Sequence, residues 1–203
     1  MNHILILKIY FRNSSLKMEY ITNKDKIIFE PEFNRKLDFD LISGYTNLIF
    51  SNHILNDRLF ESYSNNIFIK IKFSKSKFNQ DVSNLPSSLT NLIFGYNFNQ
   101  DVSNLPSSLT NLFFGYNFNQ DVSNLPSSLT NLKFGDNLDF GHNFNKDVSN
   151  LPLSLTNLKF GDNFNQDVSN LPLNLTNLKF GNNFNQDVSN LPLSLTNLKF
   201  GDN

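Results

Sequence analysis

The 203-residue sequence contains no cysteine and no tryptophan, and alanine is also absent. Without cysteine the chain can form neither disulfide bonds nor thiolate metal sites. The formal net charge is −1, which gives no general electrostatic reason to bind nucleic acid or a membrane surface. The apolar run Ile4–Leu7 is too short for a signal-peptide core or a membrane span, so we expect an intracellular, cytoplasmic protein.

What the sequence has in excess is phenylalanine, with 22 residues, and much of it belongs to a repeat. The segment FNQDVSNLPSSLTNLIFGYN at residues 78–97 is written again, almost unchanged, five more times. Successive copies are 20 residues apart except for one step of 26 residues (144 − 118), and they begin at Phe78, Phe98, Phe118, Phe144, Phe164 and Phe184. A fixed period of this length is typical of solenoids, in which each unit packs only on its neighbours.

Six apolar positions recur in every copy and predict the core of the solenoid. In the first copy they are Phe78, Val82, Leu85, Leu89, Leu92 and Phe94. One unit of 20 residues buries too few side chains to offset the conformational entropy lost when it becomes ordered. We therefore expect the copies to be stable only when they are stacked around one continuous core.

The last third of each unit predicts a short β-strand. Leu92 and Phe94 alternate with the residue between them, at the period of a strand, and the segment is too short for a helix. Pro86 and the turn residues Asp81–Asn84 interrupt the other limb of the unit. We expect a leucine-rich-repeat-like solenoid with a parallel β-sheet on one face, irregular or extended segments on the other, and little regular helix.

The pattern L-x-x-L-x-F-x-x-N at Leu89–Asn97 resembles the signature of leucine-rich repeats. The wording FN…LP-x-SLT-x-L-x-FG is closer still to the FNIP repeat family, although Gln80-Asp81 stands where FNIP units usually read x-P. The resemblance implies a non-catalytic module that binds proteins along its strand face. It also implies that the asparagine ending each strand turns inward to bond backbone groups of adjacent coils, and this column comprises Asn97, Asn117, Asn137, Asn163, Asn183 and Asn203.

The residues before Phe78 contain degenerate copies of the same repeat. Ile27–Asn34 overlays the segment from Leu92 to Asn99, and further echoes occur at Thr46–Phe50 and Ile71–Phe73. Residues 4–20 predict a β-hairpin. We assign residues 1–77 to an N-terminal β-rich cap with degenerate repeats from about residue 27, because end units of solenoids are atypical. The regular repeats are then 78–97, 98–117, 118–143, 144–163, 164–183 and 184–203.

The repeat at 118–143 carries a six-residue insertion, since Leu138–Asn143 copies Leu132–Asn137. Only one copy fits in the sheet, so we expect the other to bulge from the rim between Asn131 and Phe144. The bulge carries His142 and is either a recognition loop or a tolerated duplication.

Two columns of outward-facing residues differ from coil to coil, and they are the candidate partner-binding residues. The first column lies between the two buried strand residues and comprises Ile93, Phe113, Lys133, Lys159, Lys179 and Lys199. The second lies three residues further on and comprises Tyr96, Tyr116, Asp136, Asp162, Asn182 and Asp202. The glycine after each strand is also expected to face outward. The pattern predicts an apolar patch for a protein partner and a lysine row, which either binds an acidic segment or a phosphate or is offset by the aspartates.

An aspartate recurs in the turn of every regular unit, at Asp81, Asp101, Asp121, Asp147, Asp167 and Asp187. We expect turn capping from these residues, with Ca²⁺ binding as the alternative.

We found no catalytic constellation, and we expect neither enzymatic activity nor a cofactor. The last unit has no capping sequence, so its exposed edge suggests a second class of function. The alternatives to a recognition module are a structural protein that self-associates through this edge and a functionless gene remnant.

Overall fold

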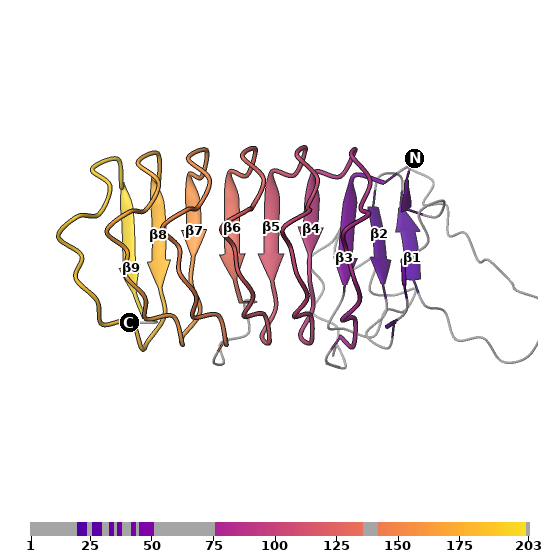
Figure 1. The fold of residues 1–203 in the computed structure, drawn as a ribbon, viewed down its shortest axis with the longest axis horizontal. Coiled ribbons are helices and arrows are strands. Elements are labelled where there is room, and N and C mark those ends of the chain that lie inside the picture. Colours follow the sequence, from indigo (N-terminus) through magenta and orange to yellow (C-terminus); the bar gives the residue numbers. More distant parts are fainter. Residues whose placement is uncertain are drawn as a thin grey trace, which may run out of the picture.

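The fold is a stack of short strands joined into one sheet, as Figure 1 shows. The structure is a computed structural model that describes residues 20–23, 26–29, 33–34, 36–37, 42–43, 45–50, 76–135 and 142–201. Within these residues, nine strands follow one another across the sheet in chain order. They are β1 (Tyr20–Asn23), β2 (Lys26–Phe29), β3 (Asn47–Phe50), β4 (Asn91–Ile93), β5 (Asn111–Phe114), β6 (Asn131–Phe134), β7 (Asn157–Lys159), β8 (Asn177–Phe180) and β9 (Asn197–Phe200).

Strands β2 to β9 are all parallel, which confirms the predicted parallel sheet. The same repeat position always meets its equivalent, so that Leu92 lies beside Leu112 and Leu112 beside Leu132. Strand β1 pairs antiparallel with β2. Residues 4–19 of the predicted hairpin lie outside the described residues. Among those described, no helix is long and apolar enough to cross a membrane.

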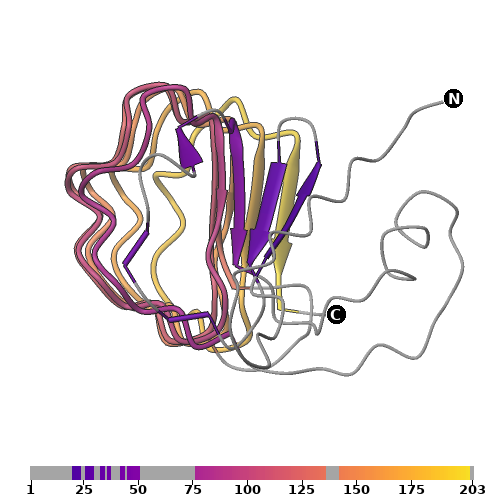
Figure 2. The same cartoon turned by 90° about the vertical axis from the view of Figure 1, so that its right-hand side faces the viewer.

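The end-on view in Figure 2 shows the strands on one side of the coil and irregular segments on the other. The buried side chains form the core between these two walls. Most side chains of the predicted core columns are buried in the coils before the last one, including Phe98, Leu109 and Leu112, each with no exposed surface. Phenylalanine rings form two columns that run the length of the stack. Phe94 stacks on Phe98, four residues later, at 3.6 Å between ring centroids, and Phe98 stacks on Phe118 of the following repeat at 6.1 Å. Each ring is therefore held from several sides, which accounts for the excess of phenylalanine.

The degenerate repeat around residues 33–50 forms part of the same stack. The ring of Phe33 lies 5.9 Å from that of Phe78, and the Asn34 side-chain oxygen accepts the Asn79 backbone N–H at 2.9 Å. Strand β3 pairs directly with β4. The degenerate repeat predicted at residues 71–73 lies outside the described residues.

Ser76 and His142, which begin the last two described ranges, occupy the same place in the coil. Ser76 accepts the Asn97 backbone N–H at 3.1 Å, just as Tyr96 accepts that of Asn117 at 3.0 Å. Tyr116 accepts the backbone N–H of Asn143 at 2.9 Å, so His142 and Asn143 occupy the positions predicted for Asp136 and Asn137. The first copy of the duplicated segment thus supplies β6, and the second supplies the end of the coil. Residues 136–141 lie outside the described part of the chain.

The glycine that follows each strand faces the preceding coil, so the prediction that it faces outward was wrong. Gly95 and Gly115 are buried, and a Cβ atom on Gly115 would overlap the carbonyl group of Gly95. A Cβ atom on Gly181 would likewise overlap the Gly161 carbonyl. Glycine is therefore required here by the close approach of two backbones.

Candidate interaction surface

The first variable column forms a continuous line across the outer face of the sheet. The strand register places Ile93 beside Phe113, then Lys133, Lys159, Lys179 and Lys199 in succession. Neighbouring strands are about 4.8 Å apart, so the column carries one side chain at each such step. It is apolar toward the N-terminus and cationic toward the C-terminus.

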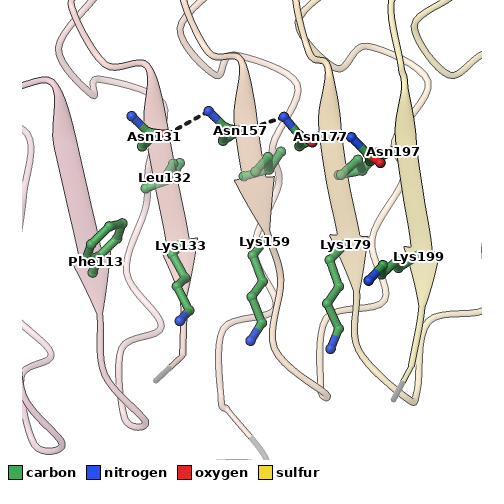
Figure 3. Close-up of a pocket in the computed structure, with 12 residues that line it drawn as sticks. Phe113, Asn131, Leu132, Lys133, Asn157, Lys159, Asn177, Lys179, Asn197 and Lys199 are labelled. Atoms are coloured by element: carbon green, nitrogen blue, oxygen red, sulfur yellow. Dashed lines mark hydrogen bonds between the residues drawn. The ribbon is translucent and has the colours of Figure 1, made fainter. Parts of the chain in front are cut away.

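A shallow groove with a volume of about 370 Å³ runs along the cationic half of this face. Its walls come from the lysine column and from the asparagine that begins each strand, with Phe113 at one end. In Figure 3 the asparagines lie toward one end of the strands, and Lys133, Lys159 and Lys179 extend from the sheet in a similar direction. The structure thus gathers five predicted site residues in one groove: Phe113, Lys133, Lys159, Lys179 and Lys199.

The asparagine row beside the lysines is a hydrogen-bonded ladder. The Nδ2 group of Asn157 donates to the Asn131 Oδ1 atom at 2.7 Å, and Asn177 donates to Asn157 in the same way. Each Nδ2 group also donates to the hydroxyl oxygen of the preceding threonine, as Asn157 does to Thr156 at 3.0 Å. Because both protons of these amides are engaged, the ladder forms an ordered floor beside the lysine row.

The tyrosines of the second column stack on one another. The rings of Tyr96 and Tyr116 are 4.6 Å apart and nearly parallel, and both side chains are half-buried. His142 continues the column with its ring edge-on to Tyr116 at 5.9 Å. Tyr96 and Tyr116 therefore form an aromatic stack on the coils whose strands carry Ile93 and Phe113.

His142 is not displayed on a protruding loop, so its prediction as a recognition residue was wrong. Only 6% of its surface is exposed. The imidazole occupies the space where Cβ atoms on Gly135 and Gly161 would lie, and Gly135 has a φ angle of 105°. His142 is thus a packing residue between two coils.

The acidic column predicted to offset the lysines is represented among the described residues by Asp162. Its Oδ1 atom accepts the backbone N–H of Asn182 at 3.2 Å, so this carboxylate links two coils. Asp136 and Asp202 lie outside the described residues. Among the described residues, that column therefore contributes one aspartate to this face.

The asparagines at the strand ends bond chiefly to each other in the hydrogen bonds that the structure gives. Asn117 donates from Nδ2 to the Asn97 side-chain oxygen at 3.0 Å. The bonds to backbone groups expected there are instead made by a different column, in which Asn79 accepts the backbone N–H of Asn99 at 2.8 Å. The F-N pair opening each repeat signalled this role, because its asparagine is kept in every copy.

The repeated aspartates cap their own turns. The Asp81 carboxylate accepts both the backbone N–H and the hydroxyl of Ser83, each at 2.9 Å. These two hydrogen bonds hold the pKa of the carboxyl below its ordinary value, and the same arrangement lowers the pKa of the five equivalent aspartates. In the part of the chain that the structure describes, no three acidic or histidine side chains are grouped closely enough to hold a metal ion.

Sequence reasoning missed a row of exposed leucines. Leu153, Leu173 and Leu193 are 72%, 74% and 103% exposed. The corresponding residues of the first three regular coils are serines, Ser87, Ser107 and Ser127. The change from serine to leucine at one repeat position was the available signal.

The stacked parallel strands, the buried leucine and phenylalanine columns and the asparagine ladders define a leucine-rich-repeat-like solenoid. The FNIP repeat family matches residues 78–116, 101–137 and 167–203. The chain therefore contains FNIP repeats. A comparison with curated proteins finds no match.

A solved structure described as CroV588, a novel circular LRR protein, has a similar fold. The two sequences are 33% identical with a TM-score of 0.56, and the similarity covers 91% of this chain and 35% of CroV588. The chain thus spans about a third of the length of that protein. The similarity supports the leucine-rich-repeat-like assignment of the coils.

Proposed function

We propose that the protein is a non-catalytic interaction module that binds a partner protein on the outer face of its sheet. The observation that carries this proposal is the column running from Ile93 and Phe113 to the four lysines. Apolar groups of the partner contact Ile93, Phe113, Tyr96 and Tyr116, and an acidic segment follows the groove along Lys133, Lys159, Lys179 and Lys199.

Charge and shape together support an acidic segment. The groove is about 370 Å³ in volume, and its lysine row places one cation in each of four consecutive coils. Like charges about 4.8 Å apart repel one another, and an anionic partner relieves this repulsion. The ordered asparagine ladder beside them supplies a pre-formed surface, which reduces the entropy lost on binding.

The test uses a labelled acidic peptide, eight glutamates followed by two phenylalanines, and measures its binding by fluorescence anisotropy. The double variant Lys159→Glu/Lys179→Glu should weaken binding by about tenfold or more, because two attractive contacts become repulsive. The matched control Lys36→Glu/Lys146→Glu makes the same change in net charge at two exposed residues away from the groove. Equal affinities of the two double variants would contradict the proposal.

The second candidate function is association through the C-terminal coil. It rests on the exposure of Leu198 and Phe200, at 41% and 45%, whereas Leu178 and Phe180 of the preceding coil are 2% and 0% exposed. An uncovered strand with apolar neighbours pairs readily with another chain. Light scattering at increasing protein concentration separates the two candidates, because only the second requires growth in particle size.

A further inference from the structure

Each leucine of the exposed row lies in a tight turn that leads into a strand. The Leu155 backbone N–H donates to the Pro152 carbonyl at 3.1 Å and closes a turn in which Leu153 is the second residue. The same bond closes the turns of Leu173 and Leu193, at 3.2 Å in each. In Figure 1 the turns that lead into β7, β8 and β9 lie side by side along one rim of the stack. We call the row Leu153, Leu173 and Leu193 the leucine ridge.

Neither the turn nor the core requires leucine at this position. In the first three regular coils the same turn, closed by the same hydrogen bond, carries Ser87, Ser107 and Ser127. Leu153 and Leu173 are 72% and 74% exposed, although each belongs to a coil whose strand pairs with the next one. Single exposed leucines are ordinary on protein surfaces, whereas a contiguous apolar strip is typical of an interface.

The backbone carbonyls of the ridge already accept hydrogen bonds. Asn174 donates from Nδ2 to the Leu153 carbonyl oxygen at 2.9 Å, and the Ser194 hydroxyl donates to that of Leu173 at 2.6 Å. Both donors belong to the following coil. A partner that covers the ridge therefore leaves neither carbonyl without a hydrogen bond, so burial of the leucines avoids the usual cost of desolvating an unpaired polar group.

The sequence around the ridge carries no charge. Within five positions of each ridge leucine, on either side, there is no aspartate, glutamate, lysine or arginine. An anionic membrane surface favours basic residues beside an apolar strip, and a charged partner favours the opposite charge. An uncharged border instead suits a surface identical to itself, because two copies meet there without repulsion between like charges.

A second copy of the chain matches the ridge in spacing, because each ridge has one leucine in each of three consecutive coils. When two ridges run in opposite directions, Leu173 meets Leu173 of the second copy, and Leu153 meets Leu193. This arrangement has a two-fold axis at Leu173 and is complete with two chains. A shift by one coil sets Leu193 against Ser127, which loses an apolar contact and disfavours other alignments.

We propose that the leucine ridge is the contact surface of an antiparallel, two-fold symmetric dimer of this chain. Three leucines from each copy make a small interface, so the dimer should form at a chain concentration on the order of 100 µM. No ridge residue lines the strand-face groove, so the inference does not depend on the proposed function. It also differs from association through the C-terminal coil, which uses Leu198 and Phe200.

The first experiment is analytical ultracentrifugation of the 203-residue chain over a range of concentrations. We expect a dimer and no larger species. The variant Leu153→Ser/Leu173→Ser/Leu193→Ser carries the residues of the first three coils and should weaken dimerisation by about tenfold or more. Leu198→Lys is the control, since it changes an exposed leucine outside the ridge and should leave the dimer intact. Circular dichroism of each variant checks that the fold is retained.

The second experiment uses single cysteines, because the natural sequence has none. Under mild oxidation Leu173→Cys should form a disulfide-linked dimer at least about tenfold faster than Leu153→Cys or Leu193→Cys alone, since only residues at the two-fold axis meet their own equivalents. A mixture of the last two variants should form a mixed disulfide. Ser107→Cys, at the same turn position outside the ridge, measures cross-linking by random collision.

A chain that stays monomeric up to a concentration on the order of 1 mM would overturn the proposal. So would a dimer that the triple serine variant retains, a dimer that Leu198→Lys abolishes, or equal cross-linking at the three ridge positions. If the chain is monomeric and binds phosphatidylcholine vesicles, and the triple serine variant does not, the ridge faces a membrane instead and the proposal is wrong.

Discussion

The first three regular coils, described over residues 78–135, and the last three, described over residues 144–201, have the same apolar columns and different exteriors. Phe114 and Phe160 are each 1% exposed and stack on equivalent neighbours. On the outer face, Ile93 and Phe113 in the first half correspond to lysines in the second half. Packing between coils fixes the interior columns, whereas solvent-facing columns are free to change. Differences in binding therefore reside in the exterior columns.

Truncating a side chain of an interior column should lower the free energy of unfolding most where its coil packs between two neighbouring coils. Phe118→Ala removes a ring that stacks between Phe98 and Phe144, and it should lower the free energy of unfolding by about 3–5 kcal/mol. Phe200→Ala is the matched control, since that side chain is 45% exposed and should lose far less. Denaturant unfolding measures both, and similar losses would contradict a shared, closely packed interior.

The glycine column should respond alike in the two halves. Gly115→Ala and Gly181→Ala each force a methyl group against the backbone of the preceding coil, so each should cost about 1–3 kcal/mol. Thermal unfolding of the two variants provides the comparison. A loss confined to one half would show that the halves stack differently.

The capping aspartates should make both halves sensitive to acid. Because the folded-state pKa of Asp101 and Asp167 is lowered, their stabilising effect is complete above the ordinary aspartate pKa of about 3.9 and is lost as pH falls through the lower folded-state pKa. Asp101→Asn and Asp167→Asn should each reduce the acid dependence of the melting temperature slightly. An unchanged pH profile in either variant would show that the carboxylate charge does not stabilise its turn.

The exposed leucines should contribute least to stability. Replacing Leu153, Leu173 and Leu193 together with serine, the residue that the first half carries, should change the free energy of unfolding by less than about 0.5 kcal/mol per site. Denaturant unfolding tests this expectation. A large loss would mean that these leucines belong to the core and that the two interiors differ.

Sequence periodicity predicted the interior well because each coil must place apolar residues at the same buried positions. The 20-residue spacing predicted the columns of Leu92 and Phe94 and the parallel sheet, and the weak echo at Phe33-Asn34 predicted another coil. The strand face of the candidate site followed from the same alternation. Strand register then placed Phe113 in line with the lysines.

What the sequence did not reveal depends on how the chain bends between repeats. The duplication at 132–143 offered two equivalent segments, and only packing decides that the first supplies β6 and the second supplies His142. The direction of the glycine after each strand depends on the turn that follows it. The one-way hydrogen bonding of Asn79 and its equivalents requires the relative height of neighbouring coils, which periodicity does not contain.

The packing of His142 also affects how the near-identical coils align with one another during folding. Near-identical units can be paired out of step during folding at little cost, because a slipped neighbour presents the same side chains. His142 is the one histidine among the described residues, and its imidazole packs between Gly135 and Gly161, so it marks a single interface. A misaligned array would lose the packing of this ring between the two glycines. The single histidine therefore favours the correct alignment of the coils over misaligned ones.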